Sequence, residues 1–328
     1  MSDKVLDTVL LLALPASGKS EVRKYLKLLP PEECRGDFHM GANAQLDDFI
    51  YVHAMRRVDE ELLKLEQGRV FFLAADRSFK DPRDWGTLIQ LVNEDYTDMV
   101  AKKKHDCSSA AEHLLGRLEA ASAKVGIPPR LAGLDAGIRE PLIKALEKEA
   151  QALQDELYAG YPDTLGGKTL VIEFARGGKD GSSMPLAAPF GYQYSLAQLS
   201  EEILSKAVIL YIWVTPEESR RKNDARTDPN DPGSILHHGV PLEVMLGDYG
   251  CDDMDWQEKE AEKPGTVTVR AHGKTFHLPI ARFDNRVDKT TFIRDDKADW
   301  KPQDVKAVHE GLKGALEKLA AASLAVKS

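Results

Sequence analysis

Cysteine is scarce in this sequence of 328 residues, since Cys34, Cys107 and Cys251 are odd in number and far apart. They have neither the even count of a disulfide framework nor the close spacing of a zinc site, which favours a reducing compartment. Long apolar runs are also lacking, because no stretch approaches the roughly 20 residues needed to cross a bilayer. The apolar run before Pro15 follows no basic leader, so we expect a cytoplasmic protein without a membrane anchor.

Positive charge is in deficit, with 44 basic against 53 acidic side chains and a net charge of -9. Such a chain repels a polyanion unless a local basic patch overrides its net charge. The compact basic run is Lys102, Lys103 and Lys104, which is typical of a solvated helix face. We therefore expect no nucleic-acid partner.

Short β-rich apolar runs alternate with longer helical patterns along the chain. This alternation predicts an α/β fold of the P-loop NTPase type, with a parallel sheet of five or six strands and helices on both faces. No long linker rich in Pro, Gly or Ser divides the chain, so we expect one large domain with insertions. The expected strands are residues 8–14, 38–46, 69–75, 169–174, 207–214 and 277–283.

Two insertions are expected in this domain. Residues 97–162 have leucine and alanine at helical spacing and predict a helical hairpin insertion, which is a possible homodimer contact. Residues 227–264 are rich in Asp, Pro and Gly and predict a lid, followed by a β-hairpin at about 265–283. The kinase-like core would then consist of residues 1–96 and 163–328, closed by an amphipathic helix at 303–324.

The segment VLLLALPASGKS places an apolar strand before a glycine-containing loop and a helical pattern after it, which is the context of a P-loop. Backbone N–H groups and the positive end of the helix would surround the phosphates of ATP, with Lys19 at the β and γ phosphates and Ser20 on Mg²⁺. Ala13 replaces the first glycine of the motif and could hinder a positive φ angle. The predicted nucleotide-binding residues are Ala13, Leu14, Pro15, Ala16, Ser17, Gly18, Lys19 and Ser20.

Carboxylates follow three further predicted strands, at Asp47 and Asp48, at Asp76, and at Glu173. Ligands of an open α/β sheet bind beyond the carboxyl ends of its strands, so we expect these acids near the P-loop. One would hold Mg²⁺ with Ser20, and another would orient the acceptor or take its proton. The sequence leaves this assignment open because strand order is not visible. We favour Asp47 at the acceptor and Glu173 or Asp76 near the metal, although each acid alone could cap a helix or turn.

Basic residues supply further candidates. His53 and Arg57 follow Asp47 on one face of a predicted helix and could contact substrate, although a solvated face is the alternative. Lys222 and Arg226 lie four residues apart on a helix that begins with a Thr-Pro N-cap, where they could reach the transferred phosphate as catalytic residues. The alternative is again a basic face in solvent.

The motifs PASGKS at 15–20, LDD at 46–48, DRS at 76–78 and TPEESRRKNDAR at 215–226 together resemble the P-loop nucleoside and nucleotide kinases. FFLAADRS is similar to the ERS element of deoxyribonucleoside kinases, and Phe283-Asp284-Asn285 is similar to their segment near adenine. The resemblance implies that Arg77 contacts substrate and that Asn285 lies near the nucleotide base. Asp48, Asp76 and Arg176 are further candidate substrate-binding residues.

The sequence therefore predicts a kinase that uses ATP and Mg²⁺ to phosphorylate a small-molecule acceptor, with a nucleoside or nucleotide favoured. One alternative is a nucleotide-dependent switch or binding protein that hydrolyses ATP slowly without an acceptor. Another is a degenerate P-loop protein with a structural role, which Ala13 suggests.

Overall fold

A computed structural model describes residues 5–226 and 239–326, with side chains for 5–225 and 239–323. The described residues form an α/β protein with a six-stranded, mostly parallel sheet in the order β2-β3-β1-β4-β6-β5. Only the pairing of β5 with β6 is antiparallel in this sheet. The strands are β1 (Thr8–Leu12), β2 (Ala42–Asp47), β3 (Lys168–Phe174), β4 (Ala207–Trp213), β5 (Thr266–Ala271) and β6 (Lys274–Asp284).

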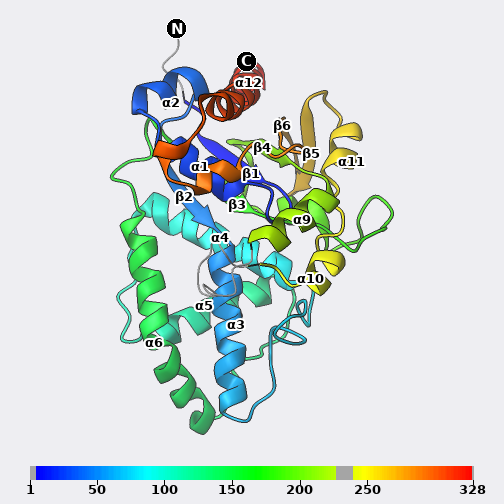
Figure 1. Ribbon diagram of the computed structural model, residues 1–328. Coiled ribbons are helices and arrows are strands. Elements are labelled where there is room, and N and C mark those ends of the chain that lie inside the picture. The colour runs from blue at the N-terminus through cyan, green and yellow to red at the C-terminus, as the bar shows by residue number, and fades with distance from the viewer. Residues whose placement is uncertain (1–4, 227–238, 327–328) are drawn as a thin grey trace.

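Helices occupy the connections between the strands except between β5 and β6, which follow each other directly (Figure 1). The α-helices are α1 (Lys19–Lys27), α2 (Pro31–Phe38), α3 (Phe49–Lys64), α4 (Asp84–Ala101), α5 (Ala110–Lys124), α6 (Ala136–Ala159), α7 (Gly191–Ala197), α8 (Glu201–Leu204), α9 (Pro216–Arg226), α10 (Leu242–Gly247), α11 (Met254–Lys259) and α12 (Pro302–Val326). Two short 3₁₀ helices, Thr291–Arg294 and Lys297–Asp299, precede α12. Within the described ranges, no helix has both the length and the apolar composition that a membrane crossing requires.

Successive side chains of a strand point to opposite faces of the sheet. Every residue of β1 is buried, as expected for a parallel strand covered on both faces. Leu10 and Leu12 of β1 belong to a hydrophobic cluster that includes residues of α4 and α7. Val9 and Leu11 belong to a second cluster with residues of α1 and α12. The central strands are therefore held by apolar contacts with two sets of helices.

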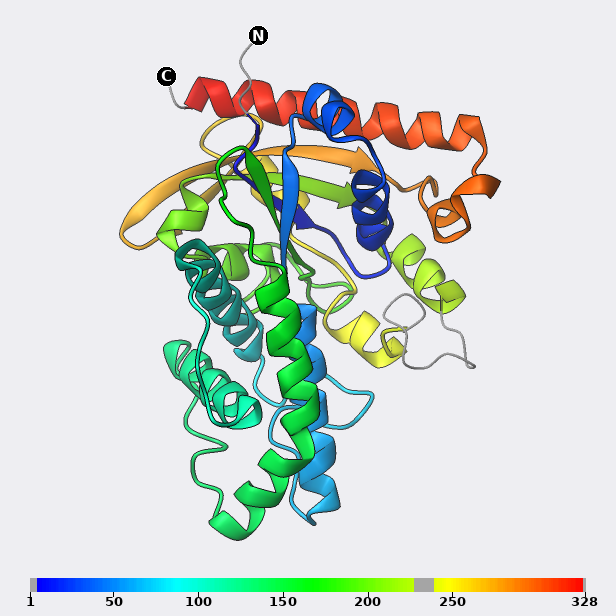
Figure 2. The ribbon, with the colours of Figure 1, turned by 90° about the vertical axis from the view of Figure 1, so that its left-hand side faces the viewer.

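A third hydrophobic cluster joins helices α3, α4, α5 and α6 away from the sheet. Figure 2 shows α3 and α6 side by side, extending away from the sheet, whereas α12 runs along β6 on the other side of the molecule. The predicted insertion at 97–162 covers the end of α4 together with α5 and α6. These two helices pack against α3 and α4, so the third cluster is built from residues inside and outside the predicted boundaries.

The expected strand at residues 69–75 is wrong. This segment makes one isolated bridge, between Phe72 and Phe79, instead of joining the sheet. The buried carboxylate of Asp59 accepts hydrogen bonds from the N–H groups of Val70, Phe71 and Phe72 at 2.6–3.3 Å. A side chain thus satisfies the backbone donors that a neighbouring strand would otherwise pair. The apolar residues here serve the third hydrophobic cluster.

Two other boundaries also differ. Residues 38–46 are not all strand, since Phe38 ends α2 and β2 begins at Ala42. Part of the predicted lid, 227–238, lies outside the described residues. The remainder, 239–264, contains α10 and α11 rather than one long loop. The hairpin expected next is present, with β5 and β6 joined at residues 272–273.

Candidate functional site

The loop that connects β1 to α1, residues 13–20 (loop 13–20), makes a tight turn into the helix. Ala16 and Gly18 have positive φ angles of 54° and 103°. Ala13 was expected to hinder a positive φ angle, but its φ angle is not positive, and the residue is fully buried. Because α1 begins at Lys19, the N–H groups of its first turn have few partners within the helix, and the positive end of the helix dipole lies at this loop.

Lys19 folds back over the start of the loop. Its Nζ donates hydrogen bonds to the carbonyl oxygens of Ala13 at 3.2 Å and Leu14 at 3.4 Å. The side chain lines the pocket next to the loop although the residue is only 8% exposed. An ammonium group and a helix N-terminus therefore act on the same space, which favours an anion there.

Two distant side chains fix the backbone of loop 13–20. The hydroxyl of Ser219 in α9 donates to the carbonyl oxygen of Pro15 at 2.7 Å. The Nδ2 atom of Asn285, after β6, donates to the carbonyl oxygen of Ser17 at 2.7 Å. Among the described residues the buried Oγ of Ser17 has no hydrogen-bond partner. The loop is thus held by its carbonyls, while a pocket hydroxyl stays available to a ligand.

Two of the predicted acids meet beside this loop. Sheet order places β3 between β1 and β2, and the register pairs Asp47 directly with Glu173. Both side chains line the same pocket as Lys19 and Ser20. The carboxyl ends of parallel strands thus converge as the general rule for open α/β sheets predicts.

Arg23 connects these acids and was not predicted. Its Nε lies 2.8 Å from Oε2 of Glu173, and its Nη1 lies 3.5 Å from Oδ2 of Asp47. Arg23 is four residues after Lys19 on α1, so both cations face the pocket from one side of the helix. This i, i+4 spacing was the sequence signal that could have identified it.

Burial raises the pKa values of Glu173 and Asp47. Desolvation raises the pKa of Glu173 to about 7, helped by the charge of Asp47 and opposed by Arg23 and Lys19. Desolvation also raises the pKa of Asp47 against the opposing effect of Arg23, although this side chain keeps 25% of its exposure by facing the pocket. Glu173 can therefore exchange a proton near neutral pH, and a cation that enters the pocket would favour the ionised form of both carboxyl groups.

Asp48 and Arg176 form a buried ion pair at the same end of the sheet. Nη2 of Arg176 lies 2.6 Å from Oδ2 of Asp48. The guanidinium also donates to Ser195 Oγ at 2.9 Å and to the carbonyl oxygen of Trp85 at 3.1 Å. Desolvation raises the pKa of Asp48 to about 6 despite Arg176. Since Arg176 is 2% exposed, the pair shapes the pocket wall.

Apolar side chains complete the pocket opposite the loop. They come from segments without a recognisable motif, so no sequence signal pointed to them. These residues are Phe49, Val52, Trp85, Phe174, Val240 and Tyr249. The pocket therefore combines a loop at a helix N-terminus, four acidic residues (Glu21, Asp47, Asp48 and Glu173) and apolar side chains, a combination suited to a phosphorylated ligand beside a ring or carbon skeleton.

Four predicted substrate-binding residues lie outside this pocket. His53 is exposed on α3, and Arg57 makes ion pairs with Glu61 and Glu149 at 2.7 and 2.9 Å. Asp76 and Arg77 are 67% and 49% exposed, on the segment that is not a strand. None of these four side chains lines the pocket in the described part of the chain.

The residues predicted from the second half of the chain have different surroundings. Lys222 is buried, with Nζ 2.9 Å from Oδ1 of Asp288. The side chain of Arg226 lies outside the described residues. Asn285 is fully buried behind loop 13–20 and bonds its backbone, so it supports the loop from the side away from the pocket.

Comparison of the chain with family models, with curated proteins and with solved structures gives no match.

Proposed function

We propose that this protein is an ATP- and Mg²⁺-dependent phosphotransferase that acts on a small-molecule acceptor, with a nucleoside or nucleotide favoured. The observation that carries the proposal is the position of Lys19, at a helix N-terminus, across one pocket from Asp47 and Glu173. This arrangement gives phosphate and a divalent cation complementary partners in one space.

We also propose a P-loop NTPase-type fold with helices on both faces of the sheet. The division of β1 side chains between two helix-containing clusters supports this proposal. The left-handed φ of Gly18 and the return of Lys19 Nζ over Ala13 and Leu14 support a phosphate-binding role for the loop. Both features place backbone donors and a cation around one point.

The residues present fit ATP and magnesium. The unpartnered hydroxyl of Ser17 lines the pocket among the loop N–H groups, and Lys19 would contact the phosphates. Ser20 and Glu173 would hold Mg²⁺, which neutralises phosphate charge when bound. Entry of a cation would keep Glu173 ionised despite its raised pKa.

Asp47 is assigned to the acceptor. Its carboxylate is partly exposed to the pocket and lies next to Glu173 in register, where it can orient a hydroxyl and take its proton. Lys19 and Arg23 supply the positive charge that faces the transferred group. Lys222 is engaged by Asp288, so in this arrangement it positions α9 rather than the phosphate.

ATP binding is the first test. ATP with Mg²⁺ should raise the melting temperature of the wild type by mass action, and Lys19→Ala should remove most of that rise. Lys27→Ala is a matched control because Lys27 is exposed on the same helix. Equal shifts in wild type and Lys19→Ala would place any nucleotide elsewhere.

An ADP-release screen across nucleosides, nucleotides, sugars and other small alcohols tests transfer. Acceptor-dependent ADP formation supports the kinase. Phosphate release that no acceptor increases would support the switch or ATPase, and failure to bind ATP would leave a structural protein.

A further inference from the structure

A second group of ionisable side chains lies where α4 meets α5, apart from the pocket at loop 13–20. Glu94 and Asp98 are one turn apart on α4, and His105 lies in the connection that follows. One ligand atom from each of these three residues lies within 4.8 Å of the other two. Nε2 of His105 is 2.7 Å from Oδ2 of Asp98. An imidazole and two carboxylates thus converge on one point.

A second imidazole adjoins the first. The ring of His113, in the first turn of α5, has its centroid 4.6 Å from that of His105, with an interplanar angle of 36°. Two imidazoles bound to one ion at about 2.0–2.1 Å place their centroids roughly 4.5–5.2 Å apart. The observed spacing is compatible with two histidines on one ion, although His113 is not among the three residues whose ligand atoms already lie within 4.8 Å of one another, so its ring would have to turn toward them.

A cavity lies at this group. Its polar lining includes Asp98, His105, His113, Arg117, Gln154 and Tyr158.

We propose that Asp98, His105 and His113, with Glu94 as a fourth ligand, bind a divalent transition-metal ion such as Zn²⁺. Mixed nitrogen and oxygen ligands suit zinc, whereas calcium and magnesium favour oxygen alone. Ligand atoms of a tetrahedral zinc site are about 3.4 Å apart. Asp98 is buried, but Glu94 and His105 are partly exposed, so rotation of these two side chains would close the group around the ion. The proposal is independent of the phosphotransferase activity.

Arg117 determines how Glu94 takes part. Its Nε donates to Oε1 of Glu94 at 3.1 Å, and its Nη2 donates to Oδ1 of Asp95 at 2.6 Å. The guanidinium balances these two charges before an ion arrives and competes for one oxygen of Glu94. Glu94 is therefore the weakest of the four ligands, and the two histidines with Asp98 are the principal ones.

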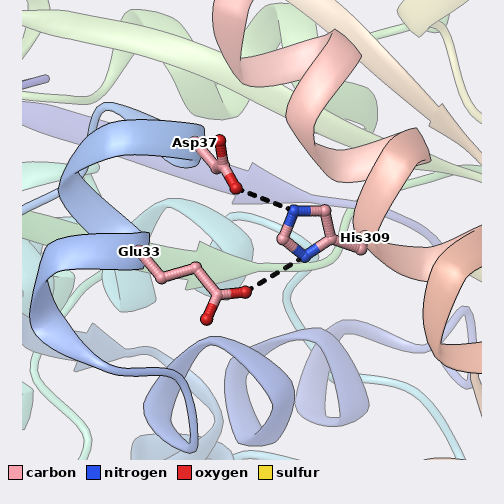
Figure 3. A group of neighbouring side chains, drawn as sticks. All are labelled: Glu33, Asp37 and His309. Atoms are coloured by element: carbon pink, nitrogen blue, oxygen red, sulfur yellow. Dashed lines mark hydrogen bonds and ion pairs between the residues drawn. The ribbon is translucent and has the colours of Figure 1, made fainter.

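Another group of similar composition has different contacts (Figure 3). Glu33 and Asp37 of α2 flank His309 of α12, whose Nε2 is 3.0 Å from Asp37. Its Nδ1 is 3.0 Å from the hydroxyl of Tyr25, and Lys313 donates to Asp37 at 2.7 Å. Both imidazole nitrogens of His309 already have hydrogen-bond partners. Lys313 donates directly to Asp37, whereas Nζ of Lys103 lies farther from Asp98, at 4.0 Å from Oδ1. This group joins two helices and provides an internal control.

Zinc binding to the full chain tests the proposal. Equilibrium dialysis should detect one tight Zn²⁺ site, and Co²⁺ should give the visible absorption of a four-coordinate ion. Loss of a residue that only hydrogen-bonds to a metal ligand already lowers metal affinity about 10–100-fold. Loss of a ligand itself should cost more, so His105→Gln and His113→Gln should each lower Zn²⁺ affinity at least about 100-fold. His309→Gln should bind as the wild type does.

The proposal is overturned if a protein carrying both His105→Gln and His113→Gln binds Zn²⁺ like the wild type. It is also overturned if His309→Gln alone abolishes binding, which would place the ion between α2 and α12. Circular dichroism checks that each variant folds. Should a histidine variant unfold, Asp98→Asn decides the matter, since a weaker site supports the assignment and unchanged affinity overturns it.

Discussion

The Nδ2 atom of Asn285 donates a hydrogen bond to the backbone carbonyl oxygen of Ser17 at 2.7 Å. It also donates to Thr290 Oγ1 at 2.9 Å, and Oδ1 of the same amide accepts from the N–H of Lys289 at 2.8 Å. Donor and acceptor are both engaged, and the side chain is fully buried. The conformation of loop 13–20 therefore depends on a residue that follows the last strand.

Replacement of Asn285 by aspartate should separate hydrogen bonding from packing. The variant keeps the shape of the side chain but loses the donor to Ser17, so it should cost about 1–3 kcal/mol of stability and weaken ATP binding. Urea unfolding and ATP titration measure the two effects. Asn285→Ala should behave similarly. If Asn285→Asp retained wild-type stability while Asn285→Ala lost it, packing of the side chain, and not its hydrogen bond to Ser17, would be what stabilises the loop.

Gly18→Ala should disrupt the loop. A Cβ at this position would lie 2.4 Å from Thr290 Oγ1 and 2.9 Å from Asn285 Nδ2, at a φ of +103°. We expect a destabilisation of at least about 1–2 kcal/mol from the backbone alone, with loss of the ATP-induced thermal shift. Ala16→Gly is the opposite control, because its φ of 54° suits glycine and nucleotide binding should persist. Normal ATP binding by Gly18→Ala would argue against the role of this loop.

Asp47→Asn should lower turnover by about 10²–10⁴-fold while ATP affinity stays near that of the wild type. The reason is that Asp47 is assigned to the acceptor, and Lys19 and loop 13–20 to the nucleotide. Steady-state kinetics with an acceptor found in the ADP screen, beside direct ATP titration, separates these effects. Asp76→Asn is a control at an exposed acid. A loss of ATP affinity with little change in turnover would instead place Asp47 beside the metal.

Glu173 should make stability depend on pH in metal-free buffer with EDTA. Its folded pKa of about 7 exceeds the value of about 4.3 expected in an unfolded chain. The folded state therefore holds the proton more tightly, and this group lowers stability as pH rises from about 4.3 to 7, with no further change above. Glu173→Gln removes this contribution, so the variant should gain relative to the wild type between pH 5 and pH 8. If the urea-unfolding midpoints of Glu173→Gln and the wild type differed by the same amount at pH 5 and pH 8, the assignment would be contradicted.

The sequence predicted the parts of the site that depend on local order along the chain. An apolar strand, a short loop and a helix follow one another around Lys19, and the strand before Glu173 contains a continuous apolar run. The strand that ends at Asp47 is more polar, with Asn43 and Gln45 among its residues. Their α/β alternation also predicted the mostly parallel sheet. The meeting of Asp47 with Glu173 required the sheet order, which no local pattern encodes.

Residues 69–75 show why the same reasoning gave a wrong strand. The aromatic, β-branched run at Val70, Phe71 and Phe72 favours a strand, but its backbone donors find Asp59 and its rings pack among helices. Tertiary contact thus overrides propensity. Arg23 was missed for a different reason, since a basic residue on an amphipathic helix is usually solvated and only the neighbouring strand ends give it a partner.

The position of β3 beside β2 has a consequence for the order of folding. The chain passes through α3, α4, α5 and α6 between these two strands, so the pairing of Asp47 with Glu173 is a contact of high sequence separation. The entropy of closing such a loop must be overcome before the pairing contributes stability, whereas α5 and α6 are sequential neighbours that contact each other early. We therefore expect the helical cluster to consolidate first, and the acidic half of the pocket to be assembled among the last contacts of the native chain.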